Sequence, residues 1–119
     1  MKNRKRSQIW GHAAEYCCIT WLMLKGYSIL ARRYRNNFGE IDIIAKRGNT
    51  VAFIEVKART DKAEALASIT PMKQQRLVRA AEMYLASMQR FAHHRLRFDA
   101  MVITSPWNIH HLQDAWRAS

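Results

Sequence analysis

The chain has 119 residues, of which 49% are hydrophobic and 24% charged. This length suits one compact domain, and the apolar content, with only four glycines and two prolines, excludes a wholly disordered chain. Twenty Lys and Arg against nine Asp and Glu give a formal net charge of +11, which favours a polyanionic partner such as nucleic acid, although an anionic membrane or an acidic protein satisfies the same charge.

The first expected element is a helix over Gln8–Lys25, with Gly26 as its C-terminal cap. Residues 1–7 are expected to form a basic, flexible tail, and residues 8–119 a single domain. The apolar run 17–24 is too short to span a bilayer, and no small-residue cleavage pattern follows it. We therefore expect a cytoplasmic protein that does not insert into membranes.

Glu15 interrupts the apolar face of this first helix. It shares a stripe with Gly11, Cys18 and Leu22, which otherwise faces the core. A carboxylate directed toward a core is costly unless it is paired or bound to a cation. Glu15 is therefore the first candidate functional residue.

Three strands are expected next, over Ser28–Tyr34, Phe38–Lys46 and Thr50–Ala58. Gly48 and Asn49 between the last two are typical of a two-residue hairpin turn.

The second half of the chain predicts a helix and one or two further strands. Thr70 is the expected N-cap of a helix that begins at Pro71 and ends near Arg90. Strands are expected over Leu96–Thr104 and, with a weaker pattern, over Asn108–Gln113. The order αβββαβ, with a final short strand, predicts an α/β fold in which helices flank a mixed central β-sheet.

The hairpin predicts how four charged side chains are arranged. If Arg47 pairs with Thr50, Asp42 lies opposite Glu55, and Glu40 lies opposite Lys57. Alternation then places these four side chains on one face of the sheet. The expected apolar neighbours on that face are Ile44, Val51 and Phe53, and those on the other face are Ile41, Ile43, Ile54 and Val56.

This arrangement suggests a metal site. Two carboxylates at facing positions repel each other, and a divalent cation such as Mg²⁺ removes that repulsion by binding their oxygens. Lys57 would orient a water and offset negative charge on an attacked phosphate, and Glu15 would approach from the helix as a further ligand. The alternative is an inert patch in which Asp42 or Glu55 forms an ion pair with Lys57.

Several other residues have a functional and a structural interpretation. Glu40 belongs either to the catalytic face or to an ion pair with Lys57. For Asp99 we favour a structural hydrogen-bonding role. We expect the histidine pairs, His93-His94 and His110-His111, at the surface, and most of the tryptophans in the core. Basic or polar residues that would contact phosphates, or else lie at the solvated surface, are Arg32, Arg33, Arg35, Arg59, Lys73 and Gln74.

The order of short motifs resembles a known family. These motifs are Gly11-x-x-x-Glu15, Gly39-Glu40-Ile41-Asp42, Phe53-Ile54-Glu55-Val56-Lys57-x-Arg59, a helix starting near Lys73, and Arg97-Phe98-Asp99. Over nearly the whole chain they resemble the bacterial YraN-type family, small proteins classed as endonucleases by similarity to archaeal Holliday-junction resolvases and the restriction-endonuclease-like PD-(D/E)xK superfamily. Arg33 stands where that family often has Asn.

The resemblance implies a restriction-endonuclease-like domain with catalytic residues Glu15, Asp42, Glu55 and Lys57. It implies that Glu15, Asp42 and Glu55 hold Mg²⁺ or Mn²⁺, and that the reaction is hydrolysis of phosphodiester bonds in DNA, including branched or structured DNA. Junction resolvases act as dimers, so the resemblance is consistent with a homodimer.

Two alternatives remain open at this stage. One is a nucleic-acid-binding module on the same fold that cleaves nothing, and the other is a protein-interaction domain whose positive charge serves an acidic partner.

Overall fold

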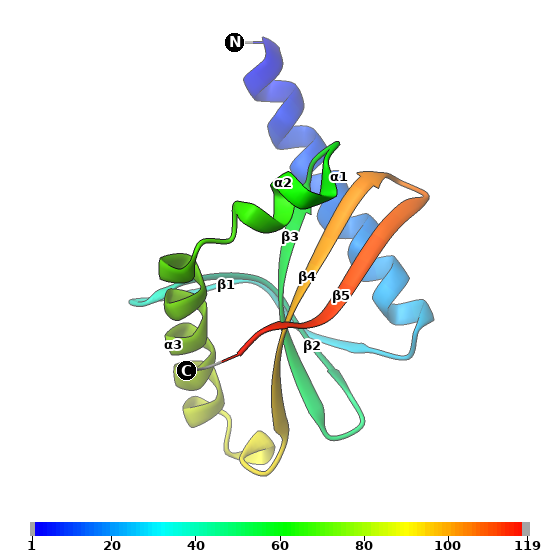
Figure 1. Cartoon of the computed structure of the whole chain (residues 1–119). Helices are drawn as coiled ribbons and strands as arrows, with labels where there is room; N and C mark the ends of the chain where they lie inside the picture. The colour runs from blue at the N-terminus through cyan, green and yellow to red at the C-terminus, as the bar shows by residue number, and fades with distance from the viewer. Residues whose placement is uncertain (1, 118–119) are drawn as a thin grey trace.

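The computed structural model describes residues 2–117, with side chains from residue 11 onward. Its centre is one five-stranded sheet, in which the strands lie side by side in chain order (Figure 1). These strands are β1 (Ser28–Asn36), β2 (Gly39–Arg47), β3 (Thr50–Ala58), β4 (Arg95–Ser105) and β5 (Asn108–Trp116). Only β3 and β4 run parallel, and the other neighbours are antiparallel. The expected mixed sheet with flanking helices is confirmed.

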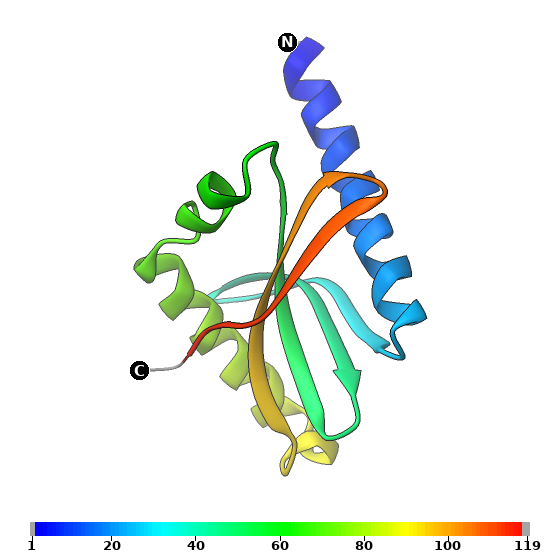
Figure 2. The ribbon, with the colours of Figure 1, turned by 45° about the vertical axis from the view of Figure 1, so that its right-hand side comes forward.

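Helices cover both faces of this sheet. Helix α1 (Lys2–Leu24) lies on one face, and α3 (Pro71–Ser87) lies on the other (Figures 1 and 2). A short helix, α2 (Lys62–Ala67), precedes α3, and a 3-10 turn (Gln89–Phe91) follows it. The connection from β3 to β4 therefore passes through α2 and α3, which is how a chain joins two parallel neighbours.

The hydrophobic core is divided by the sheet into two clusters. The α3-side cluster includes Ile44, Phe53, Leu77 and Tyr84, and the α1-side cluster includes Cys18, Leu22, Ile43 and Ile54. The alternation expected for β2 and β3 explains most of this division. Ile41 is an exception: it was expected with Ile43 but packs in the α3-side cluster.

Local sequence signals account for several boundaries. Gly26, at φ 91°, ends α1, and the Tyr27 amide donates a hydrogen bond to the Leu22 carbonyl at 3.0 Å, as in a glycine-terminated helix. Gly48, at φ 60°, forms the β2–β3 turn, and Arg47 pairs with Thr50 as predicted. The Thr70 side chain accepts a hydrogen bond from the Lys73 amide, and Pro71 is the first residue of α3.

Other boundaries differ from the sequence prediction. Helix α1 begins at Lys2 rather than Gln8 and includes the residues expected as a tail. Helix α3 ends at Ser87 instead of near Arg90, and β5 continues to Trp116. Helix α2 was not predicted, although its N-cap Asp61 accepts hydrogen bonds from the amides of Ala63 and Glu64.

The part of the chain that the structure describes has no helix long and apolar enough to cross a membrane.

Candidate metal and active site

Strands β2 and β3 separate at the position of the expected carboxylate pair. Their register runs from Arg47–Thr50 to Ile43–Ile54 and stops there, one pair before Asp42 and Glu55. The prediction that Asp42 and Glu55 are directly paired is therefore wrong. The Asp42 carboxylate instead accepts a hydrogen bond from the Val56 amide, with Oδ2 at 2.8 Å from the nitrogen.

A bend in the neighbouring strand accompanies this separation. Arg33, between the paired positions Arg32–Ile43 and Tyr34–Ile41, has φ 48°. Residues other than glycine rarely adopt this left-handed conformation, which changes the direction of the strand. Since the alternation of β2 breaks between Ile41 and Ile43, Ile41 joins the α3-side cluster, and Asp42 occupies the break.

Asp42 is partly buried and has no cation as a direct partner among the described residues. Burial, followed by the negative charge of Glu55, raises the pKa of Asp42 from 3.8 to about 7, and the hydrogen bond from Val56 only partly opposes this rise. Both causes would be relieved by a cation at this position.

Glu55 has the opposite environment. Its side chain is only 6% exposed, and two ammonium groups contact its Oε1 atom: Lys57 Nζ at 3.3 Å and Lys73 Nζ at 2.7 Å. Lys57 follows two residues later on β3, whereas Lys73 comes from the first turn of α3. The ion pair between Glu55 and Lys57, which the alternative interpretation predicted, is thus present. It leaves Asp42 without such a partner.

The two lysines differ in their electrostatics. Burial, followed by the hydrogen-bonded contact with Lys73, lowers the pKa of Lys57. Burial also disfavours the charge on Lys73, but its contacts with Glu55 and Lys57 more than offset this and raise the pKa of Lys73. Lys73 is therefore the better counter-ion of Glu55, and Lys57 is the lysine closer to giving up its proton.

Two pockets meet at Asp42. A pocket of about 460 Å³ on the α3 side is lined by residues that include Asp42, Glu55, Lys73 and Arg76. A smaller pocket of about 210 Å³ on the α1 side is lined by residues that include Asp42 and Glu15. Asp42 is thus accessible from both faces of the sheet, because β2 has separated from β3.

Glu15 lies close to this position but has its own partner. Its carboxylate Oε2 is 3.2 Å from Nε of Arg33, and its side chain is 14% exposed. The sequence prediction that Glu15 is directed inward is confirmed, and its charge contributes to the raised pKa of Asp42. The structure brings Glu15 into the Asp42 pocket without joining it to Glu55.

The donor set can be tested against the needs of a metal ion. Among residues 11–117, no three His, Cys, Asp or Glu side chains are close enough to hold a metal ion by themselves. Mg²⁺ needs only one or two carboxylates, because it keeps waters and takes substrate oxygens as further ligands. Asp42 and Glu55 line one pocket and repel each other, so these two residues fit Mg²⁺ or Mn²⁺.

The other predicted site residues have varied surroundings. Glu40 does not pair with Lys57, as one interpretation predicted, because it pairs with Arg35 of β1 at 3.0 Å. The Gln74 side chain donates to the Ile69 carbonyl and so supports the turn before α3. Arg32 lies over the Tyr16 ring, and Arg59 is exposed beyond the end of β3.

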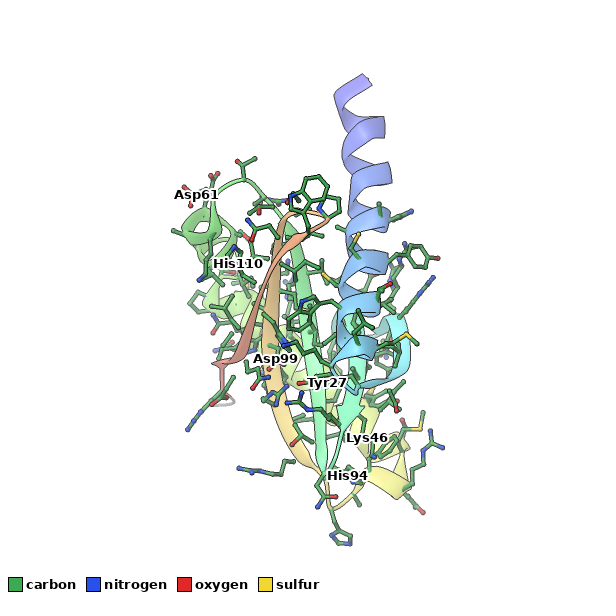
Figure 3. All side chains as sticks on the ribbon, turned by 90° about the vertical axis from the view of Figure 1, so that its right-hand side faces the viewer. Tyr27, Lys46, Asp61, His94, Asp99 and His110 are labelled. Carbon is green, nitrogen blue, oxygen red and sulfur yellow. The ribbon has the colours of Figure 1, made fainter. Side chains whose placement is uncertain are left out.

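A buried network around Asp99 confirms its structural role. Asp99 is fully buried and accepts two hydrogen bonds from Arg97, at 2.8 and 2.7 Å. Nε2 of His111 lies 2.8 Å from Asp99 Oδ2, and Arg97 also donates to the Tyr27 hydroxyl at 2.6 Å. Figure 3 shows Asp99 and Tyr27 near each other on the α1 side of the sheet. This network joins β4, β5 and the end of α1.

The expectation of surface positions for the histidine pairs is wrong for His111, whose side chain is 4% exposed. His111 pairs with Met101 of β4, so its side chain lies on the same face of the sheet as Asp99, two residues before Met101. Among the tryptophans, Trp116 is buried as expected, but Trp107 is 87% exposed in the β4–β5 turn.

Comparisons with known proteins identify the family. The family described as Uncharacterised protein family UPF0102 matches residues 2–103. A UPF0102 protein of Methylocella silvestris is 51% identical over 108 residues, covering 90% of this chain and 86% of the relative. A UPF0102 protein of Bradyrhizobium diazoefficiens is 47% identical over 109 residues, covering 92% and 82%. A UPF0102 protein of Bartonella bacilliformis is 41% identical over 113 residues, covering 94% and 92%. The chain belongs to the UPF0102 family.

Proposed function

We propose that this protein is a Mg²⁺- or Mn²⁺-dependent endonuclease that hydrolyses phosphodiester bonds in DNA. The observation that carries the proposal is that Asp42 and Glu55 line one pocket, that Lys57 contacts Glu55 at 3.3 Å, and that Asp42 lacks a cationic partner within the described part of the chain. The residues fit the catalytic set of the PD-(D/E)xK resemblance, and the mixed sheet is consistent with it.

Asp42 and Glu55 would hold the metal, and Glu15 would support the site from the side of Asp42. Bound there, the metal would supply Lewis acidity toward a phosphodiester oxygen and lower the pKa of a water. Asp42 must be ionised to bind it, so its pKa of about 7 makes the site sensitive to pH near neutrality.

Lys57 has the role of orienting the attacking water and stabilising the charge that develops on the phosphate. Its side chain is 13% exposed and is held by Glu55, so it presents its ammonium group without a large rearrangement.

The net charge of +11 supports a nucleic-acid substrate. DNA that is branched or otherwise structured, a homodimer that cuts two strands, and a location in the cytoplasm complete the proposal, and they rest on the resemblance to junction resolvases and on the sequence.

A non-catalytic nucleic-acid-binding module is the second candidate. It is favoured by the two lysines that already contact Glu55, because such a cluster needs no metal for charge balance at that carboxylate. The raised pKa of Asp42 argues for the endonuclease, since a pure binding surface gains nothing from an unpaired carboxylate beside phosphates.

A cleavage assay tests the proposal. The full chain would be incubated with linear, flapped and four-way-junction DNA in Mg²⁺, Mn²⁺ or EDTA, beside Asp42→Asn and Lys57→Ala. We expect metal-dependent cleavage by the wild type and a loss of at least about 100-fold in each variant, the scale of removing one charge-stabilising group.

Circular dichroism of all three proteins is the control for folding. A wild type that binds these DNAs without cutting any of them would support the binding module instead. A wild type that neither binds nor cuts nucleic acid would contradict both candidates.

A further inference from the structure

Lys73 forms the shortest ion pair in the candidate site. Its Nζ is 2.7 Å from Glu55 Oε1, against 3.3 Å for Lys57 Nζ on the same oxygen. A metal ion that binds Glu55 needs this carboxylate, and two ammonium groups beside it repel a divalent cation. Binding of the metal therefore requires that at least one lysine move away.

The positions of the two lysines indicate which one moves. The Lys57 side chain is 13% exposed and is attached to the same strand as Glu55, whereas the Lys73 side chain is 38% exposed. Lys73 also lines the pocket of about 460 Å³, together with Arg76 of the next turn of α3. Lys73 can therefore leave Glu55 and remain within the pocket.

The wall of this pocket suits a phosphate group. Lys73 and Arg76, which both line it, contribute two positive charges. A phosphate group entering this pocket would meet both cations beside the site of cleavage.

We propose that Lys73 is a second functional lysine of this site, which neutralises Glu55 in the metal-free protein, is replaced there by the divalent cation, and then contacts a DNA phosphate in the α3-side pocket. The first part concerns the metal alone, whereas the contact with DNA rests on the proposed function. The replacement keeps Glu55 neutralised at every stage, so the buried carboxylate is never left unpaired.

The first test measures Mn²⁺ binding to the full chain without DNA, by electron paramagnetic resonance. Lys73→Gln removes the competing ammonium group, and Arg79→Gln, on the exposed side of α3, removes the same charge away from the pocket. We expect Lys73→Gln to bind Mn²⁺ about five- to tenfold more tightly than either the wild type or Arg79→Gln, the scale of losing one competing ion pair. Lys73→Arg, which keeps the pair, should bind as the wild type does.

The second test measures binding of junction DNA against salt concentration, in Ca²⁺ and in EDTA. In Ca²⁺, Lys73→Gln should reduce the slope of log K against log salt by about 0.9, the value for one phosphate contact. In EDTA the slope should equal that of the wild type, because Lys73 is then held by Glu55. A merely structural ion pair would not produce this dependence on metal.

The outcomes separate this inference from the proposed function. If Lys73→Gln is folded and binds Mn²⁺ no more tightly than Arg79→Gln, the displacement of Lys73 is overturned, whatever the cleavage assay shows. If Mn²⁺ binding tightens while the wild type cuts no DNA, the displacement stands and the endonuclease fails. If Lys73→Gln and the wild type have equal slopes of log K against log salt in Ca²⁺, the contact between Lys73 and DNA is overturned.

Discussion

Asp42 is the residue whose environment most clearly favours a bound cation. Its carboxylate accepts a hydrogen bond from the Val56 amide, faces the charge of Glu55 and has a pKa raised to about 7. Ionisation of Asp42 therefore destabilises the folded protein. A bound metal ion would offset this effect.

This environment predicts how stability depends on pH. The unfolded chain ionises Asp42 from about pH 4, whereas the folded chain does so near pH 7, so the wild type loses stability as the pH rises between these values. Asp42→Asn cannot ionise and should raise the free energy of unfolding at pH 8 by about 1–3 kcal/mol, with the difference vanishing near pH 4.

Urea denaturation in EDTA at a series of pH values measures this difference. Glu82→Gln, which removes an exposed carboxylate from α3, is the control and should show no comparable dependence on pH. An Asp42→Asn variant that is less stable than the wild type at pH 8 would show that the carboxylate is not strained by its surroundings.

Asp99 has a structural role, and its pKa is shifted in the opposite direction to that of Asp42. Burial alone would raise its pKa, but hydrogen bonds from His111, Arg97 and the Asp114 amide hold the pKa below its ordinary value. Its stabilisation is therefore present above pH 4 and is lost as the pH falls through the lower folded pKa.

Asp99→Asn leaves the Arg97 guanidinium, 18% exposed, without its anionic partner. We expect a cost of about 3–5 kcal/mol at pH 7, measured by urea denaturation. Asp114→Asn removes a carboxylate from an exposed ion pair with Arg117 and should change stability little. Equal effects of the two substitutions would mean that the buried network contributes no more than a surface pair.

Helix α3 connects the fold to the site, because its first turn carries Lys73. The Thr70 side chain caps this turn through the Lys73 amide. Thr70→Ala should lower the free energy of unfolding by about 1 kcal/mol and, by loosening the first turn, should reduce the rate of DNA cleavage as well.

Thr60→Ala, in the exposed segment after β3, is the matched control. It should change neither the free energy of unfolding nor the rate of DNA cleavage. Urea denaturation and the cleavage assay would be made on the same preparations. A normal cleavage rate in a destabilised Thr70→Ala variant would show that the start of α3 does not position the site.

Elements with a local signal were predictable from the sequence. The Gly48-Asn49 turn determined the β2–β3 register, and Thr70-Pro71 determined the start of α3, because both depend on residues adjacent in the chain. Alternation along β3 then places Glu55 and Lys57 on one side of that strand. Helix α2 was missed, although Asp61 followed by Glu64 is a usable capping signal.

Features that depend on distant residues were not predictable. The separation at Asp42 involves the left-handed backbone of Arg33 on β1, a conformation that Asn adopts more easily than Arg. The contact between Lys73 and Glu55 joins α3 to β3 across the fold. A lysine in the first turn of a helix is disfavoured by the helix dipole, which is a weak sign of a nearby carboxylate.

Two features of the whole molecule are its net charge of +11 and the length of α1, which begins at Lys2. The N-terminal turns of α1 project beyond the sheet, at the end where β3 finishes (Figures 1 and 2). The sequence places Lys2, Arg4, Lys5 and Arg6 there. If the protein binds DNA as proposed, this end of the molecule is suited to contact it outside the candidate pocket.

Removal of residues 2–7 tests this arrangement at the scale of the whole molecule. The shortened chain should keep its circular dichroism spectrum apart from the lost helical turns. Its binding to junction DNA should weaken, with the slope of log K against log salt reduced by about 2–4 if the four basic residues contact phosphates. An unchanged slope would mean that this end of α1 does not contact DNA.

The central claim is that Asp42 and Glu55 bind a divalent cation, and crystals soaked in Mn²⁺ test it most directly through anomalous scattering. We predict a peak within coordination distance of both carboxylates, with the Lys73 ammonium group moved away from Glu55 Oε1. A well-ordered site with no Mn²⁺ peak, and with Lys73 still bound to Glu55, would contradict the metal site and with it the proposed endonuclease.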